Sequence, residues 1–232
     1  MKTLFDFDIT LEEAEELIKN GADVNVKSSG GFTPLHFIKN IEIIQLLIKH
    51  NVDVNVANEE GNTPLFFVEN IQVAELLIEH GADVNATNKT DFTPLHSAFD
   101  FEIAQLLIKH GARINHRNIF GQTPLGTCSV LEAMKLLIEH GADINAKDGH
   151  GFFVLDYQYD IDNIKYLIDH GAIGRRRSYQ EFREYFSVEQ QKAFDAFISI
   201  TNNDDEFYQM CLAYQEGLKN NVTMDIKDMD II

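Results

Sequence analysis

The segment Gly31-Phe32-Thr33-Pro34-Leu35-His36 returns along the chain at a fixed spacing, with new copies beginning at positions 61, 91, 121 and 151. These copies are Gly61-Asn62-Thr63-Pro64-Leu65-Phe66, Asp91-Phe92-Thr93-Pro94-Leu95-His96 and Gly121-Gln122-Thr123-Pro124-Leu125-Gly126, with a degraded copy at Gly151-Phe152-Phe153-Val154-Leu155-Asp156. A fixed period of about 20–50 residues is typical of a stacked array. The sequence therefore predicts a solenoid in which each 30-residue unit packs against its neighbours.

A second segment of each unit has the pattern of an amphipathic helix. In residues 41–50, the apolar positions 43, 44, 47 and 48 share one face, and Glu42, Gln45 and Lys49 share the other. The Leu-Ile pair of positions 47 and 48 occurs six times in the phase of the repeat, from 17 and 18 to 167 and 168, which indicates one continuous core. Glycine follows these helices, where a left-handed residue is favoured, and Asn51 takes its place once.

The Thr-Pro-Leu segment and the Gly-Ala-Asp-Val-Asn segment that ends at Asn85 together resemble the ankyrin repeat. Thr33 can cap a helix with its hydroxyl, and Pro34 suits the first helical position. The resemblance implies an all-α ankyrin-repeat solenoid of about six helix-turn-helix units with hairpin-like finger loops, plus a C-terminal helical extension. The usual period is about 33 residues. Because the missing residues lie between the two helices, the first helix or its turn should be nearly one turn shorter.

Four regions follow from the phase of the repeat. Residues 1–30 are expected to form a degenerate N-terminal capping repeat, and residues 31–174 five ankyrin repeats of the shortened, 30-residue kind. Residues 175–220 are aromatic-rich and predicted to be helical, with a capping box from Ser187 to Gln190. They form either a cap over the last repeat, because an array end exposes an apolar layer, or a small helical subdomain with its own partner. Residues 221–232 are expected to be a flexible acidic-hydrophobic tail.

Composition narrows the compartment and the class of partner. A net charge of −18 disfavours nucleic acid and suits either a solvated surface or a basic protein partner. Two unpatterned cysteines, Cys128 and Cys211, indicate a reducing compartment. With no visible signal peptide and no apolar run of about 20 residues, we expect a cytoplasmic monomer without a membrane partner, or a protein delivered into a host cytosol. Frequent Ile, Asn and Lys suggest an AT-rich genome, as in host-associated bacteria or large viruses.

The sequence contains no motif that supports catalysis. Histidines at positions 50, 80, 110, 140 and 170 end successive second helices, but neighbours should lie roughly 10 Å apart, whereas zinc needs ligands at about 2 Å. They suit helix C-termini instead. Cys128 has no motif-level partner and is expected to be structural. We therefore expect a non-enzymatic protein without catalytic residues, metal or cofactor.

The resemblance implies that a protein partner binds through the finger loops and the concave face of the first helices. The candidate partner-binding residues are Phe32, Glu59, Glu60, Asn62, Lys89, Phe92, Ile119, Phe120, Gln122, His150 and Phe152. Three phenylalanines in one column can mark an interface, or can pack between adjacent fingers or under the C-terminal extension. An alternative function is a targeting arm of an effector whose C-terminal region recruits or modifies a host protein. Three roles remain open for Arg175-Arg176-Arg177: interaction with a helix C-terminus, a docking patch, or recognition by a kinase that phosphorylates Ser178.

Overall fold

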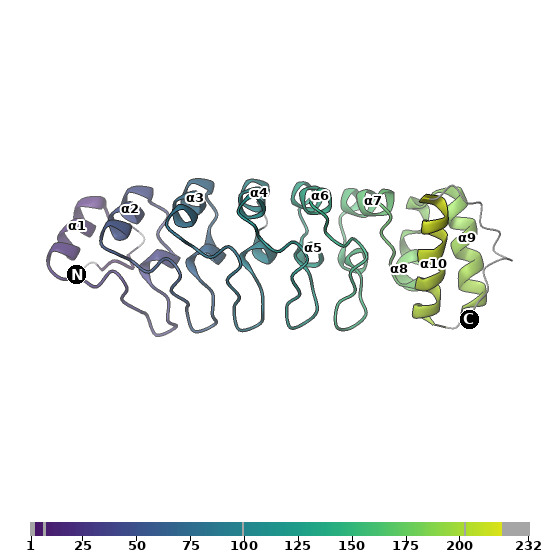
Figure 1. The fold of residues 1–232 in the computed structure, drawn as a ribbon, viewed down its shortest axis with the longest axis horizontal. Coiled ribbons are helices and arrows are strands. Elements are labelled where there is room, and N and C mark those ends of the chain that lie inside the picture. The colour runs from purple at the N-terminus through teal and green to yellow at the C-terminus, as the bar shows by residue number, and fades with distance from the viewer. Residues whose placement is uncertain (1–2, 7, 99, 202, 220–232) are drawn as a thin grey trace.

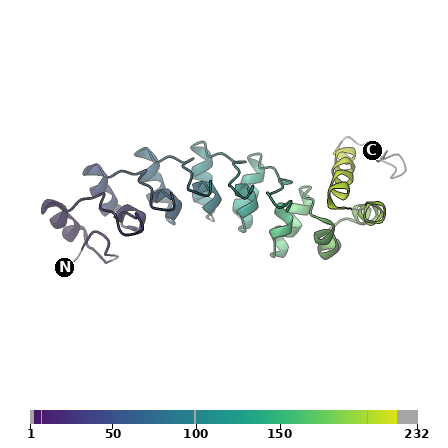
Figure 2. The ribbon, with the colours of Figure 1, turned by 90° about the horizontal axis from the view of Figure 1, so that it is seen from below.

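The computed structural model describes residues 3–6, 8–98, 100–201 and 203–219. The chain forms an elongated array in which a row of helices runs along one side and loops project from the opposite side (Figure 1). The row consists of nine-residue helices, α1 (Leu11–Lys19), α2 (Ile41–Lys49), α3 (Ile71–Glu79), α4 (Phe101–Lys109), α6 (Leu131–Glu139) and α7 (Ile161–Asp169). Seen from the loop side, the units follow one another along a gently curved line (Figure 2). The described residues contain helices and no strand, so the expected all-α solenoid is confirmed.

The core is a stack of identical leucines from consecutive units. Leu47, Leu77, Leu107 and Leu167 are fully buried, and Leu137 is nearly so. Leu17, in the first layer, is half-buried. Burial of one leucine contributes about 1.5–3 kcal/mol. The array is therefore held together by contacts between neighbouring layers.

Each second helix begins and ends at a position that the period keeps constant. The Asn40 side chain accepts hydrogen bonds from the backbone N–H groups of Glu42 and Ile43, at 2.9 and 3.3 Å. Asn70, Asp100 and Asp160 do the same for their helices. After α2, Asn51 has a φ of 59°, the left-handed conformation that the sequence predicted for this glycine position.

The first helix of each repeat is reduced to a single turn. These turns are η1 (Pro34–His36), η2 (Pro64–Phe67), η3 (Pro94–Ser97), α5 (Pro124–Thr127) and η4 (Val154–Tyr157). All but α5 are 3₁₀ helices, which suits short segments. The shortened unit therefore gives up most of its first helix. At η1, the Thr33 hydroxyl bonds the imidazole Nδ1 of His36 at 2.9 Å, and the Thr33 backbone N–H donates to the same nitrogen at 3.0 Å.

A ladder of asparagines ties each repeat to the next. The Asn55 side chain accepts a hydrogen bond from Asp83 N at 2.8 Å and donates one to Gly81 O at 2.8 Å. Equivalent acceptor bonds link Asn25 to Asp53, Asn85 to Arg113, Asn115 to Asp143 and Asn145 to Ile173. The Asn of the Asp-Val-Asn segment therefore satisfies backbone groups of the following unit.

The chain beyond the last repeat folds into α8 (Arg176–Phe182), η5 (Arg183–Tyr185), α9 (Val188–Ile200) and α10 (Asp204–Lys219). The capping box at Ser187 and Gln190 opens α9, as the sequence predicted. Tyr179, Phe194 and Phe197 are almost fully buried. These helices therefore have an aromatic core of their own. The expected tail at residues 221–232 lies outside the described residues.

Asp156 joins these helices to the repeats. It occupies the position of His36 and His96 in two earlier copies. Its carboxylate accepts hydrogen bonds from Phe153 N at 2.8 Å, Arg175 N and Nε at 3.2 Å, and Ser178 Oγ. The Asp156 side chain is 1% exposed. Ser178 is also buried, so its hydroxyl lies inside this junction and not on a surface where a kinase acts.

Thr63 lacks the hydrogen-bond partner that the corresponding threonines of the neighbouring repeats have. This difference predicts an effect on stability. Its buried hydroxyl has no hydrogen-bond partner, because Phe66 replaces the histidine found at His36 and His96. We expect Phe66→His to raise the free energy of unfolding by about 0.5–1.5 kcal/mol, since the imidazole bonds Thr63 and the Phe92 carbonyl. Urea melts would measure the gain. Phe66→Leu supplies no such bonds, and an equal gain with leucine would contradict this explanation.

Candidate functional site

The finger loops have a common frame built on one polar side chain. Asn58 Oδ1 accepts hydrogen bonds from Glu60 N and Asn62 N, both at 2.9 Å, and the Asn58 backbone N–H bonds Asn62 O at 3.0 Å. Asn88, Asn118 and Asp148 organise the next three loops in the same way. The loops are hairpin-like in shape and are each closed by two backbone bonds, in the second finger Asn58 N to Asn62 O and Gly61 N to Asn58 O. The described residues contain no strand, only an isolated bridge between Lys147 and Phe153.

Adjacent fingers are also bonded to one another through the backbone. Glu59 N donates to Gly30 O at 2.9 Å and Lys89 N to Glu60 O at 2.9 Å. Ile119 N donates to Thr90 O at 3.1 Å, and Gly149 N to Phe120 O at 2.7 Å. Side chains on the loops are therefore held at a regular spacing on a continuous support, which suits a binding surface.

The predicted site residues fall into two groups by exposure. Glu59, Glu60, Lys89 and His150 are exposed, together with the two apolar residues at the fourth finger, Ile119 at 57% and Phe120 at 45%. The five residues that precede the Thr positions are half-buried, namely Phe32, Asn62, Phe92, Gln122 and Phe152. The exposed group supplies the loop tips, and the half-buried group lies where the loops meet the short helices.

Each phenylalanine of the column packs against side chains of its own unit or of the unit that follows. The Phe32 ring lies 5.4 Å from His36 and 5.0 Å from Phe37, between ring centroids. Phe92 lies 5.3 Å from His96 and 6.5 Å from Phe120. The Phe152 ring stacks on Tyr157, and the Arg175 guanidinium lies 3.6 Å from its centroid. Substitution at these three positions therefore removes internal contacts as well as exposed surface.

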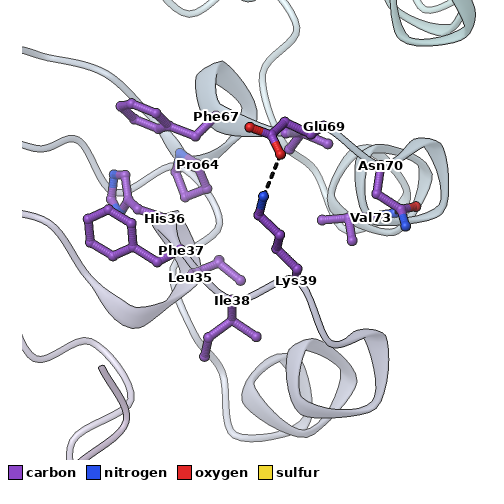
Figure 3. A pocket seen from close by; sticks show the side chains of 11 residues that line it. Leu35, His36, Phe37, Ile38, Lys39, Pro64, Phe67, Glu69, Asn70 and Val73 are labelled. Atoms are coloured by element: carbon purple, nitrogen blue, oxygen red, sulfur yellow. Dashed lines mark hydrogen bonds and ion pairs between the residues drawn. The ribbon is translucent and has the colours of Figure 1, made fainter. Parts of the chain in front are cut away.

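Beside Phe32, the short helices of two repeats enclose a pocket of about 260 Å³. Its walls include Leu35, Phe37, Ile38, Pro64, Phe67 and Val73 (Figure 3). The Phe67 ring lies 5.8 Å from Phe32 and 5.8 Å from His36, so these aromatic side chains form one cluster. Lys39 and Glu69 form an ion pair across the pocket.

A second pocket of about 280 Å³ lies next to the first, toward the N-terminus. Phe37, Ile38 and Lys39 line both pockets, and Leu4 and Ile43 complete the apolar wall of the second. Both pockets are lined by the residues that join the short helix to the second helix, where this repeat is shorter than usual. Apolar recesses therefore lie at the short connection between the two helices.

The sequence analysis did not single out Phe37 and Phe67. The signal was present, because the two phenylalanines are one repeat apart and occupy one column. Phe67 is 38% exposed, and an exposed aromatic side chain beside an apolar pocket is a common feature of protein interfaces. The asparagine column of the fingers, at positions 58, 88 and 118, was likewise readable from the period.

A family model of ankyrin repeats, built from three copies, matches residues 9–88 and 68–148. The chain belongs to the ankyrin repeat family. A search of curated proteins finds no match. Ankyrin repeats generally mediate protein–protein interaction, and the family is typically non-enzymatic.

Metal binding and membrane spanning can also be assessed for the part of the chain that the structure describes. Over these residues, no group of three His, Cys, Asp or Glu side chains could hold a metal ion. Nor does any helix among them have the length and apolar character needed to span a bilayer. The exposed residues of the finger loops and the walls of the pockets offer apolar contact and hydrogen bonding.

Proposed function

We propose that this ankyrin repeat protein is a non-enzymatic scaffold that binds a protein partner through its finger loops and short helices. The observation that carries the proposal is the combination of exposed apolar residues with the aromatic-lined pocket. Ile119, Phe120 and Phe67 are all more than a third exposed, although apolar side chains of this size are usually covered. Large apolar anchors of this kind contribute most of the binding energy in many interfaces.

The partner is proposed to be basic, and the chain to act as a cytoplasmic or host-delivered monomer. Support for the partner's charge comes from a net charge of −18 and from Glu59 and Glu60 at the second finger. Support for the compartment comes from Cys128 and Cys211, which are both buried and unpaired. Self-repulsion of the acidic chain favours the monomer.

Residues 175–219 are proposed to cap the last repeat. The Phe153 and Tyr208 ring centroids lie 4.7 Å apart, and Lys147 Nζ lies 4.4 Å from the centroid of Tyr208. Gln215 Nε2 donates to Gly171 O at 2.9 Å, at the end of α7. These contacts support a cap over the alternative, a separate recruiting or modifying activity of an effector.

Serine substitution of Ile119 and Phe67 together, called the loop variant, is expected to weaken partner binding at least about tenfold. Ile119 is exposed enough that its replacement should change the melting temperature little, whereas Phe67 also packs on Phe32 and His36, so its replacement should lower the melting temperature modestly. The partner is obtained by affinity capture from cells that express the chain and is then purified. Isothermal titration calorimetry with the purified protein measures the affinity of each variant.

The matched control is Val188→Ser, which removes an apolar side chain that is 59% exposed but lies on α9. It should leave the affinity unchanged. The proposal fails when no captured protein binds in purified form, or when every binder tolerates the loop variant as well as it tolerates Val188→Ser.

A further inference from the structure

A second exposed apolar surface lies on the turns that join the short helices to the second helices. We call residues 100–102, 129–132 and 159–162 the turn edge. Its exposed apolar side chains are Phe101 at 38%, Val130 at 36%, Tyr159 at 93% and Ile161 at 51%. They come from three consecutive repeats, so they form a row that follows the long axis of the array.

The exposure of these apolar side chains is not a general feature of the repeat. At the position of Ile161, Ile41 and Ile71 in earlier repeats are partly buried and pack against the core. At the position of Tyr159, the earlier repeats have Lys39 and Glu69, which form an ion pair. The apolar row is therefore a property of the C-terminal half of the array. A tyrosine with 93% of its surface exposed contributes almost nothing to the stability of the fold.

The turn edge is also acidic. Five carboxylates lie among its residues, from Asp100, Glu102, Glu132, Asp160 and Asp162, and the same segments contain no lysine or arginine. Glu132 is paired with Lys135 at 2.8 Å. Lys135 and Lys165, one turn along α6 and α7, lie over the rings of Tyr166 and Tyr185. The surface thus presents apolar side chains within a negative field.

This edge is separate from the finger loops. The turn edge lies at the N-terminal ends of α4, α6 and α7, whereas the finger loops follow their C-terminal ends. A nine-residue helix is about 13 Å long. A partner on the fingers can therefore leave the turn edge free.

We propose that the turn edge is a second docking surface, which binds a basic protein segment with apolar side chains. The apolar side chains of the bound segment cover Tyr159, Ile161 and Val130, and the lysines or arginines of that segment face the carboxylates of Asp160 and Asp162. A second copy of this chain fits poorly, because two acidic edges would face each other in a chain of net charge −18. The proposal goes beyond the finger-loop site.

The test uses a displayed library of short random peptides, selected against the full chain. Each enriched peptide is then titrated against three proteins by fluorescence anisotropy. These are the natural sequence, the edge variant with Tyr159→Ser and Ile161→Ser, and the loop variant. Since the substituted side chains of the edge variant are exposed, its melting temperature should match that of the natural sequence.

We expect a class of peptides that is rich in Lys or Arg and apolar residues, loses at least about tenfold in affinity with the edge variant and is unaffected by the loop variant. The same class should bind several-fold more weakly to Asp160→Asn, which removes a charge but keeps a helix-capping residue of the kind found at Asn40 and Asn70. Added salt should also weaken the binding of these peptides.

Three results would overturn the proposal. The first is that no enriched peptide is sensitive to the edge variant, and the second is that the sensitive peptides are acidic or uncharged. The third is a concentration-dependent dimer in sedimentation velocity that the edge variant abolishes, which would assign the edge to a second copy. Peptides sensitive only to the loop variant would leave the finger-loop function standing while removing this one.

Discussion

Replacement of Asp156 by alanine is expected to release the C-terminal helices from the last repeat while the repeats remain folded. The carboxylate holds Phe153 N, Arg175 and Ser178 together at a side chain that is 1% exposed. Alanine leaves the partly buried Arg175 guanidinium and the buried Ser178 hydroxyl without their acceptor. Loss of one partner of a buried pair costs about 3–5 kcal/mol.

The thiol of Cys211 reports this release. It is fully buried in α10, and burial raises its pKa, so it should react very slowly with a maleimide in the natural protein. In a Cys128→Ala background, Cys211 is the sole thiol. We expect Asp156→Ala to speed its labelling by at least about a hundredfold, because the rate follows the free energy of opening.

Two further variants make the result specific. Asp156→Asn keeps an acceptor oxygen but loses the charge, so its labelling rate should lie between those of the natural residue and alanine. Asp169→Ala removes an exposed carboxylate at the end of α7 and should change little. Unchanged labelling of Cys211 in Asp156→Ala would show that aromatic packing alone, such as Phe153 on Tyr208, holds the helices in place.

Features that repeat in phase were predictable from the sequence. The leucine stack, the left-handed Asn51 and the capping box at Ser187 each depend on a local rule or on one column of the repeat. The shortening between the helices was also predictable, since the short period of this repeat is incompatible with a full first helix. The finger loops and short helices could therefore be nominated as a binding surface.

Features that depend on a neighbour at a variable position were not predictable. Whether Phe32 is exposed depends on Phe37 and on Phe67, which belongs to the next repeat. The role of Asp156 depends on a segment that does not repeat, so the period gave no reason to connect it with Arg175. The pockets beside Phe37 are each lined by residues of two neighbouring units, and the pattern of one unit does not describe how two units meet.

Acid should destabilise the array through a buried histidine. His96 is 3% exposed, and burial lowers its pKa to about 4, with His116 adding a smaller lowering effect. Thr93 N donates a hydrogen bond to His96 Nδ1 at 3.1 Å, so this nitrogen must be unprotonated, and Nε2 lies 3.2 Å from the Gln122 carbonyl. Protonation of Nδ1 would break the Thr93 bond and place a charge in the core.

The direction of the effect follows from the two pKa values. The unfolded chain binds a proton at His96 below about pH 6.5, whereas the folded chain binds it only near pH 4. The stability is therefore fully present above pH 6.5 and is lost as the pH falls toward 4. The full loss is on the order of 3 kcal/mol, and His36, whose pKa burial also lowers, adds to it.

His96→Phe tests this assignment with a residue that the chain already uses at the matching position, Phe66. At about pH 7.5 the variant should be less stable than the natural protein by about 1 kcal/mol, because the bonds to Thr93 and Gln122 are lost. Between about pH 7.5 and pH 4.5 it should lose much less stability than the natural protein does. Urea melts across this range measure both effects, and His110→Gln, at an exposed helix end, is the control. An unchanged pH dependence in His96→Phe would assign the acid sensitivity to other groups.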